Sequence, residues 1–130
     1  MVIDTSALVA VLLDEPDRRR YTRALADAPI RALSAATLLE AGIVIEARLG
    51  DAGGRELDLL LHRADVAVIP VDAAQAELAR AAWRRYGKGR HPAALNYGDC
   101  FSYALAVQRD EPLLFKGDDF AATDVRPALR

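Results

Sequence analysis

Short apolar runs alternate with longer amphipathic segments along this chain, and this alternation limits the fold more than any other feature. The short runs predict strands at 2–4, 30–33, 66–71 and 112–115, with a last edge strand at 123–125. The longer segments predict helices at 6–13, 17–28, 35–49, 53–63, 72–86 and 96–109. Strands separated by helices are typical of a parallel sheet with helices on both faces. The sequence therefore predicts an α/β fold built on a mainly parallel sheet.

Residues that start or stop helices set the predicted boundaries. Pro16 ends the first helix, because the residue before a proline avoids helical geometry. Gly50 is predicted to end the helix at 35–49, and Asp72 is predicted to cap the helix that follows the third strand. The stretch GDDF at 117–120 predicts a tight turn or a short helix.

Composition narrows the class of protein further. The chain has 130 residues, 52% of them hydrophobic, so one domain spanning 1–130 with a full core is expected. A net charge of -2 argues against bulk electrostatic binding of nucleic acid, although local basic patches stay possible. The single cysteine, Cys100, excludes an intrachain disulfide and a cysteine zinc site. Asp4 falls too early for a secretory leader and no apolar run is long enough for a membrane, so a cytoplasmic protein is expected.

Acidic residues directly follow two of the predicted strands. Asp4 ends the first strand, and Asp118 and Asp119 come after the strand at 112–115. The carboxyl ends of parallel strands meet at one edge of a sheet, and ligands bind beyond that edge. Taken singly, Asp4 could equally cap the next helix, and the two later acids could form an ordinary polar turn.

Two further acids lie on predicted helix faces that are otherwise mostly apolar. Glu40 and Asp99 both have small or apolar neighbours one helical turn away. These neighbours are Ala36, Thr37, Ile43 and Val44 for Glu40, and Leu95, Ser102, Tyr103 and Ala106 for Asp99. Asp99 could still be a first-turn acid in a helix capped by Asn96, whereas Glu40 in mid-helix has no capping use.

Carboxylates that converge need a positive charge between them. Two carboxylates about 4 Å apart repel by roughly 4 kcal/mol at an effective dielectric constant of about 20. His62 and His91 are isolated in the sequence and are predicted to lie at the surface, so nitrogen ligands are not expected. Oxygen ligands alone select hard cations such as Mg²⁺ or Mn²⁺. An acidic site of this kind at the end of a parallel sheet suits phosphoryl chemistry, because such ions activate water and stabilise the attacking and leaving oxygens.

Four stretches together resemble the PIN-domain ribonucleases, and specifically the VapC-type toxins of toxin–antitoxin pairs. The stretches are VIDTSALVAVLLDEP, SAATLLEAGIV, LNYGDCFSYALA and PLLFKGDDF. They place Asp4, Glu40 and Asp99 at the first three acid positions of that family. The resemblance extends from Met1 to about Thr123, and the order and spacing of the stretches make it specific.

The fourth acid position departs from the family pattern. The last strand of these proteins is often followed by a Thr-x-Asp or Thr-x-Asn turn ahead of an acid–Phe pair. Here Lys116 and Gly117 follow the strand, so the threonine and the early acid are missing. Asp119 matches the acid of the acid–Phe pair and is the favoured fourth member, with Asp118 as its rival.

The resemblance implies a three-layer α/β/α sandwich and endonucleolytic cleavage of RNA that depends on Mg²⁺ or Mn²⁺. It implies Asp4 and Asp99 as the principal metal ligands. Glu40 would assist directly or through water, and Asp119 or Asp118 would complete the acidic pocket. A homodimer and a VapB-type antitoxin that blocks the acidic site are implied as partners.

Positive charge near the acids is expected to hold the RNA. Lys88 and Arg90 lie in the loop before the third acid, and Lys116 precedes the acidic turn. A solvated loop accounts for the same residues equally well. Thr5 and Ser6 could donate hydrogen bonds to a carboxylate or a phosphate, or cap the first helix.

Two aromatic residues, Trp83 and Tyr86, come just before this loop. Aromatic rings at a nucleic-acid site stack on bases. Packing in the core or in a dimer interface is the more common use of such residues and is the prediction here.

Two other classes of protein share parts of this pattern. A receiver-like phospho-acceptor domain also places acids and a lysine at strand ends, but its acceptor would have to be Asp72, which resembles a helix cap, and Glu40 would have no role. A PIN-like binding module with lost catalysis fits the altered fourth acid, although the intact acids at the first three positions argue against it.

Overall fold

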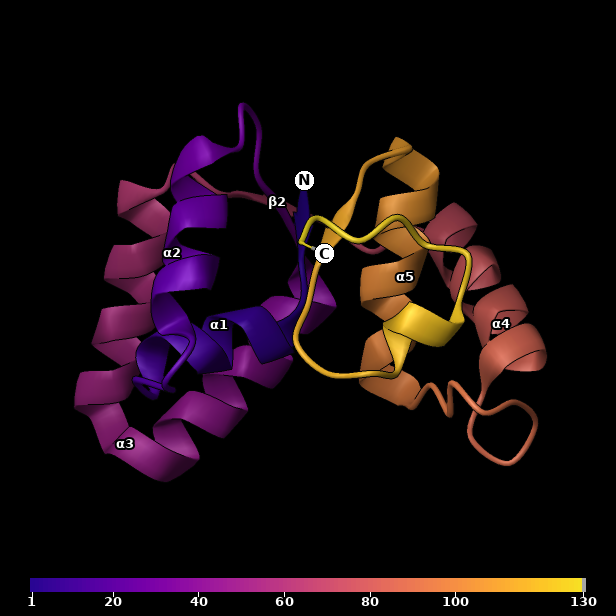
Figure 1. The fold of residues 1–130 in the computed structure, drawn as a ribbon, viewed down its shortest axis with the longest axis horizontal. Coiled ribbons are helices and arrows are strands. Elements are labelled where there is room, and N and C mark those ends of the chain that lie inside the picture. The colour runs from indigo at the N-terminus through magenta and orange to yellow at the C-terminus, as the bar shows by residue number, and fades with distance from the viewer. Residues whose placement is uncertain (130) are drawn as a thin grey trace.

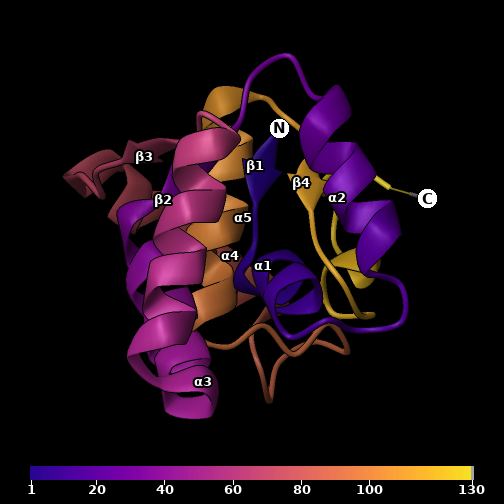
Figure 2. The same ribbon diagram turned by 90° about the vertical axis from the view of Figure 1, so that its left-hand side faces the viewer.

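A parallel sheet organises the computed structural model, which describes residues 1–129 (Figure 1). Its strands are β1 (Val2–Ile3), β2 (Ala32–Ser34), β3 (Ala67–Ile69) and β4 (Leu113–Leu114). Their order is β3-β2-β1-β4 and every pairing is parallel, so β1 lies inside the sheet (Figure 2). The helices are α1 (Thr5–Leu12), α2 (Arg18–Asp27), α3 (Ala35–Arg63), α4 (Ala73–Tyr86) and α5 (Tyr97–Arg109), with a short 3₁₀ helix η1 (Phe120–Ala122).

Successive residues of each inner strand point to opposite faces of the sheet, and each face has its own core. Val2 packs with the residues of α4 and α5, whereas Ile3 packs with those of α1, α2 and α3. Both side chains are completely buried. Figure 1 shows α1, α2 and α3 on one side of the strands and α4 and α5 on the other. The prediction of an α/β fold with helices on both faces is therefore confirmed.

Helix caps turn the chain sharply where the strands end. Asp4 follows β1 and caps α1, and Ser34 ends β2 and caps α3 by accepting a hydrogen bond from a backbone amide. Asp72 caps α4 and Asn96 caps α5 in the same way. Because β1 passes into α1 without a loop, the side chain of Asp4 is fixed at the carboxyl end of an inner strand.

The two predicted helices at 35–49 and 53–63 are joined in α3. Gly50 has left-handed backbone geometry, with φ +66° and ψ -159°, so the helix kinks at the residue predicted to end it. The helical hydrogen bonding resumes directly after this kink, which is why no separate loop forms there.

Two expectations about strands were wrong. The run at 66–71 was predicted to be a buried strand, but β3 is the edge of the sheet and Val68 is 41% exposed. The segment 123–125 forms no strand; instead Pro127 makes an isolated parallel bridge to Leu113. The hydrogen bonds of this bridge come from the residues on either side of Pro127: the Leu113 amide donates to the Arg126 carbonyl and the Ala128 amide to the Leu113 carbonyl, both at 2.8 Å.

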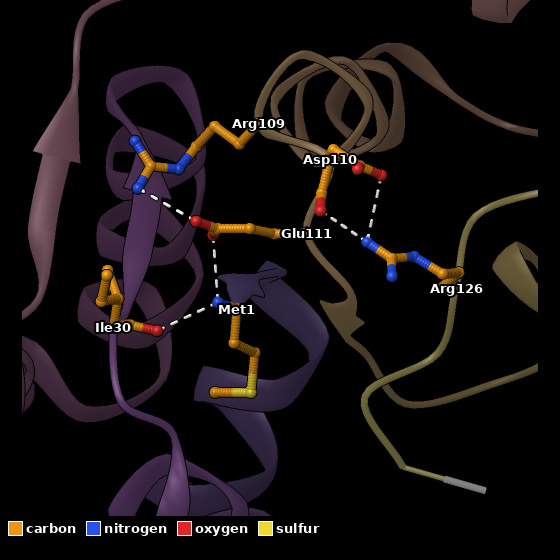
Figure 3. Close-up of polar contacts among 6 residues, drawn as sticks. All are labelled: Met1, Ile30, Arg109, Asp110, Glu111 and Arg126. Atoms are coloured by element: carbon orange, nitrogen blue, oxygen red, sulfur yellow. Dashed lines mark hydrogen bonds and ion pairs between the residues drawn. The ribbon is translucent and has the colours of Figure 1, made fainter.

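The other end of the sheet is held by a polar cluster (Figure 3). The α-ammonium of Met1 donates to the carbonyl of Ile30 at 3.0 Å and forms an ion pair with Glu111 at 3.0 Å. Glu111 also accepts from Arg109 at 3.2 Å. These contacts tie the starts of β1, β2 and β4 together, opposite the edge where Asp4 lies. Within residues 1–129 no helix is both long and apolar enough to cross a membrane.

Candidate acidic site at the end of the sheet

Asp4 is a buried carboxylate held by hydroxyl and amide donors. Its side chain is 3% exposed. Oδ2 accepts from the backbone amide of Ser6 at 3.0 Å and from the Ser6 hydroxyl at 2.6 Å, while Oδ1 accepts from the Ser102 hydroxyl at 2.6 Å. The sequence left two roles open for Asp4, the cap of the next helix or an acid at the edge of the sheet. In the structure Asp4 caps α1 and is also a buried acid at that edge.

Glu40 reaches the site from α3. The Thr5 hydroxyl donates to Oε1 of Glu40, which links the start of α1 to the second turn of α3. Gly98, in the first turn of α5, lies so close that a Cβ added there would be 1.9 Å from Oε2 of Glu40. The carboxylate therefore rests against the backbone of α5. Ile43, an apolar neighbour that the sequence suggested would be buried, is 61% exposed, so Glu40 lies at the margin of the core.

Asp99 stands at the first turn of α5 in a capping box. Its Oδ2 accepts from the backbone amide of Asn96 at 3.0 Å, and the Asn96 side chain accepts from the Asp99 amide at 3.0 Å. The pKa of Asp99 is raised to about 6, first because burial disfavours its charged form. The negative charges of Asp4, Asp119 and Glu40 raise it further, against the lowering effect of the Asn96 bond. The structure thus brings these four acids into one electrostatic neighbourhood.

The two acids of the GDDF turn are not equivalent. Both are exposed. Asp119, directly before η1, is one of the charges that raise the pKa of Asp99. This coupling favours Asp119 over Asp118 as the fourth member, and its role in the site stays a prediction.

A buried pair of hydroxyls was missed by the sequence reasoning. Ser102 is completely buried, and its hydroxyl lies 3.3 Å from that of Thr37, which is 1% exposed. The available signal was spacing: Ser102 follows Asp99 by three residues and so shares its helix face. For Thr5 and Ser6 the sequence left donation to a carboxylate or phosphate and capping of the first helix as alternatives, and both hydroxyls donate to carboxylates.

The donor set suits a hard divalent cation, although it is not arranged around one. Every candidate ligand is a carboxylate oxygen, and after burial the negative charges of Asp4, Asp119 and Glu40 contribute to the raised pKa of Asp99, a contribution that a cation would offset. Within residues 1–129, no three Asp, Glu, His or Cys side chains form a group that could hold a metal ion. Instead, Oε1 of Glu40 accepts from the Thr5 hydroxyl and Oδ1 of Asp4 accepts from the Ser102 hydroxyl.

A family model of the PIN domain matches residues 1–126. The chain belongs to the PIN-domain family. It is 66% identical over 125 residues to Ribonuclease VapC of Mycolicibacterium smegmatis, an alignment that covers 96% of this chain and 97% of that protein. This identity places the PIN domain among the VapC ribonucleases and confirms the resemblance inferred from the four motifs.

Solved structures agree with this PIN-domain fold. VapC20 of Mycobacterium tuberculosis, described as a Sarcin-Ricin loop cleaving toxin, has a TM-score of 0.77 at 22% identity, covering 97% of this chain and 98% of that one. A toxin-antitoxin complex from Klebsiella pneumoniae has a TM-score of 0.72 at 21% identity, covering 99% and 94%. The receiver-like alternative is therefore wrong, and its candidate acceptor, Asp72, is the cap of α4.

The basic residues of the PIN domain differ in their contacts. Lys116 forms ion pairs with Glu15 and Asp17, which raise the pKa of its ammonium and join the loop after β4 to the start of α2. Arg90 lies over the ring of Trp83, 4.4 Å from its centroid. Lys88, Arg90 and Lys116 stay predictions as RNA contacts, and the charge of Lys116 is already balanced by two carboxylates.

Proposed function

We propose that this PIN-domain protein is an endoribonuclease and that it hydrolyses RNA phosphodiester bonds with Mg²⁺ or Mn²⁺ bound among its acids. The observation that carries the proposal is the influence of three carboxylates, Asp4, Glu40 and Asp119, on the pKa of Asp99, next to the carboxyl end of the inner strand β1. A cluster of like charges lowers the stability of the fold unless a counter-charge is bound, and a divalent cation is the counter-charge that suits all-oxygen ligands. The high identity to a protein named Ribonuclease VapC supports the same activity.

Each acid has a distinct part in the proposed reaction. Asp4, fixed by Ser6 and Ser102, and Asp99, fixed by its capping box, would hold the cation. A divalent cation bound there lowers the pKa of a coordinated water and offsets charge on the phosphate. Glu40 would orient the attacking water and accept its proton, and Asp119 would close the negative end of the site.

Purified protein should cleave a structured RNA when Mg²⁺ or Mn²⁺ is present, and EDTA should stop the cleavage. Asp4→Asn and Asp99→Asn should each lower the rate by roughly a hundredfold or more, because each removes charge at the reacting centre. Asp119→Asn should lower the rate as well, while Asp118→Asn provides a matched control with near wild-type activity. Equal cleavage by wild type and the Asp4 and Asp99 variants would reject the proposal.

We also propose that the protein acts as a toxin, forms a homodimer and is inhibited by a VapB-type antitoxin that covers the acidic site. Leu39 and Ile43 lie beside Glu40 in sequence on α3 and are 65% and 61% exposed, which is typical of a surface that another protein covers. The Klebsiella toxin-antitoxin complex of the same fold supports this partnership. Expression of the wild type should arrest growth, and Asp4→Asn should relieve the arrest. Antitoxin binding by a wild-type protein that cleaves no RNA would instead indicate a binding module that has lost catalysis.

A further inference from the structure

A groove between α4 and α5 combines exposed aromatic rings with arginines next to the acidic site. It has a volume of about 690 Å³. Its side walls include Arg80, Trp83, Arg84, Arg90, Tyr97 and Phe101. Cys100, which follows Asp99 directly in α5, also lines it. We call this surface the α4–α5 groove.

The rings in this groove are unusually open to solvent. Tyr97 is 82% exposed, although it is the first residue of α5 and stands two residues before Asp99. It makes an edge-on contact with Phe101, with ring centroids 4.9 Å apart. Trp83 is 43% exposed, so it does not pack in the core of the chain and its packing in a dimer interface stays a prediction, whereas Tyr86 is buried in the core. Exposed flat rings in a groove offer surfaces on which other rings stack.

The charges in the groove favour an anion. Three guanidinium groups line it in a protein whose net charge is -2. Arg90 brings its positive charge directly over the exposed Trp83 ring, and Arg80 is balanced by Glu77 at 3.0 Å. Arginine beside aromatic rings is the combination that single-stranded nucleic acids require, because phosphates pair with the cations while bases stack on the rings.

We propose that the α4–α5 groove binds single-stranded RNA, with bases stacked on Trp83 and Tyr97 and phosphates paired with Arg84 and Arg90. This rests on the proposed nuclease function and adds the place where the substrate is held. Tyr97 and Asp99 both lie in the first turn of α5, so RNA held in this groove would lie within one helical turn of the acidic site. Bases in a duplex are already stacked on each other, so the groove selects unpaired segments.

Trp83 is the only tryptophan of the chain, so its fluorescence reports on this groove alone. An RNA oligomer of about eight nucleotides, which suits a short stacking surface, should quench this emission to saturation in the cleavage-deficient Asp4→Asn protein. Tyr97→Ala in the same background should weaken binding roughly tenfold, and Arg84→Gln should weaken it and reduce its dependence on salt. Val107→Ala, another exposed apolar residue of α5, and Arg19→Gln, an exposed arginine of α2, are matched controls that should bind RNA unchanged.

The outcomes separate the groove from the nuclease. RNA binding without quenching, or unchanged binding by both groove variants, would overturn the groove while leaving cleavage intact. Quenching and weakened variants in a protein that never cleaves RNA would support the groove and reject the nuclease. A shift of Trp83 emission that follows protein concentration without RNA, together with dimer formation, would assign the groove to a second copy of the chain and overturn the inference.

Discussion

Replacing Asp99 with Asn should stabilise the metal-free fold at neutral pH, although it removes a proposed metal ligand. Burial first, and the charges of Asp4, Asp119 and Glu40 next, raise the pKa of Asp99 from 3.8 to about 6. Between these two pH values the folded state binds more protons than the unfolded state, so the free energy of unfolding falls as the pH rises from about 4 to about 6. Above pH 6 Asp99 is charged in the folded and in the unfolded state, so the full loss in the free energy of unfolding is present.

The structure sets the size of this effect. A rise in pKa from 3.8 to about 6 corresponds to about 3 kcal/mol, at about 1.4 kcal/mol for each tenfold change in proton affinity. The side chain of Asp99 is only partly buried, and solvent screening reduces the expected gain to about 1–2 kcal/mol. The amide oxygen of Asn can still accept the hydrogen bond from the Asn96 amide, so the capping box is kept. For a domain of this size the gain raises Tm by roughly 3–8 °C.

Urea and thermal unfolding in EDTA, from about pH 4 to about pH 8, would measure this difference. The Asp99→Asn protein should be more stable than wild type above pH 6, and the two should converge near pH 4. Asp118→Asn removes a neighbouring exposed acid and should give no comparable gain. A variant that is less stable than wild type at neutral pH, or whose gain is the same at both ends of the pH range, would refute the reasoning.

Two substitutions test how the acids are held. Ser102→Ala leaves Oδ1 of the buried Asp4 without its hydroxyl donor and should lower the free energy of unfolding by about 2 kcal/mol in urea denaturation, and a loss below about 0.5 kcal/mol would show that Asp4 does not need it. Gly98→Ala places a carbon 1.9 Å from Oε2 of Glu40, so it should displace the carboxylate, destabilise the fold and reduce RNA cleavage. The loss of stability should be much smaller when Glu40→Ala is already present, and equal losses in both backgrounds would mean that another group is displaced.

The succession of strands and helices along the chain was predictable because each element has a strong local signal in the sequence. Asp4, Asp72 and Asn96 mark helix starts by the chemistry of their side chains, and the structure uses all three as caps. The exposure of β3 was not predictable, because a β-branched run has the same sequence pattern at the edge of a sheet as at its centre. Only the strand order distinguishes the two, and it depends on contacts between distant segments.

The candidate acids could be selected from the sequence because a charged residue is unexpected in a mostly apolar segment. The residues that hydrogen-bond to them could not, because they are of types that are common at their positions. Glu40 stands out as a carboxylate in a mostly apolar segment, which indicates a function. Ser102 lies on a buried helix face, where a serine has the same sequence pattern as any small core residue. The contacts of Lys116 were equally hidden. Its partners Glu15 and Asp17 come about a hundred residues earlier, and nothing in the local sequence connects them.

The hydrogen-bond donors around the acids order the carboxylates and leave their negative charge in place for the proposed cation. Asp4 and Glu40 are held by the hydroxyls of Ser6, Ser102 and Thr5, which orient a carboxylate without neutralising it. An arginine or lysine in the same place would have cancelled the charge and lowered the pKa of Asp99 instead of leaving it raised. Neutral donors therefore preserve the negative potential, and the proposed divalent cation would be attracted by all of these acids.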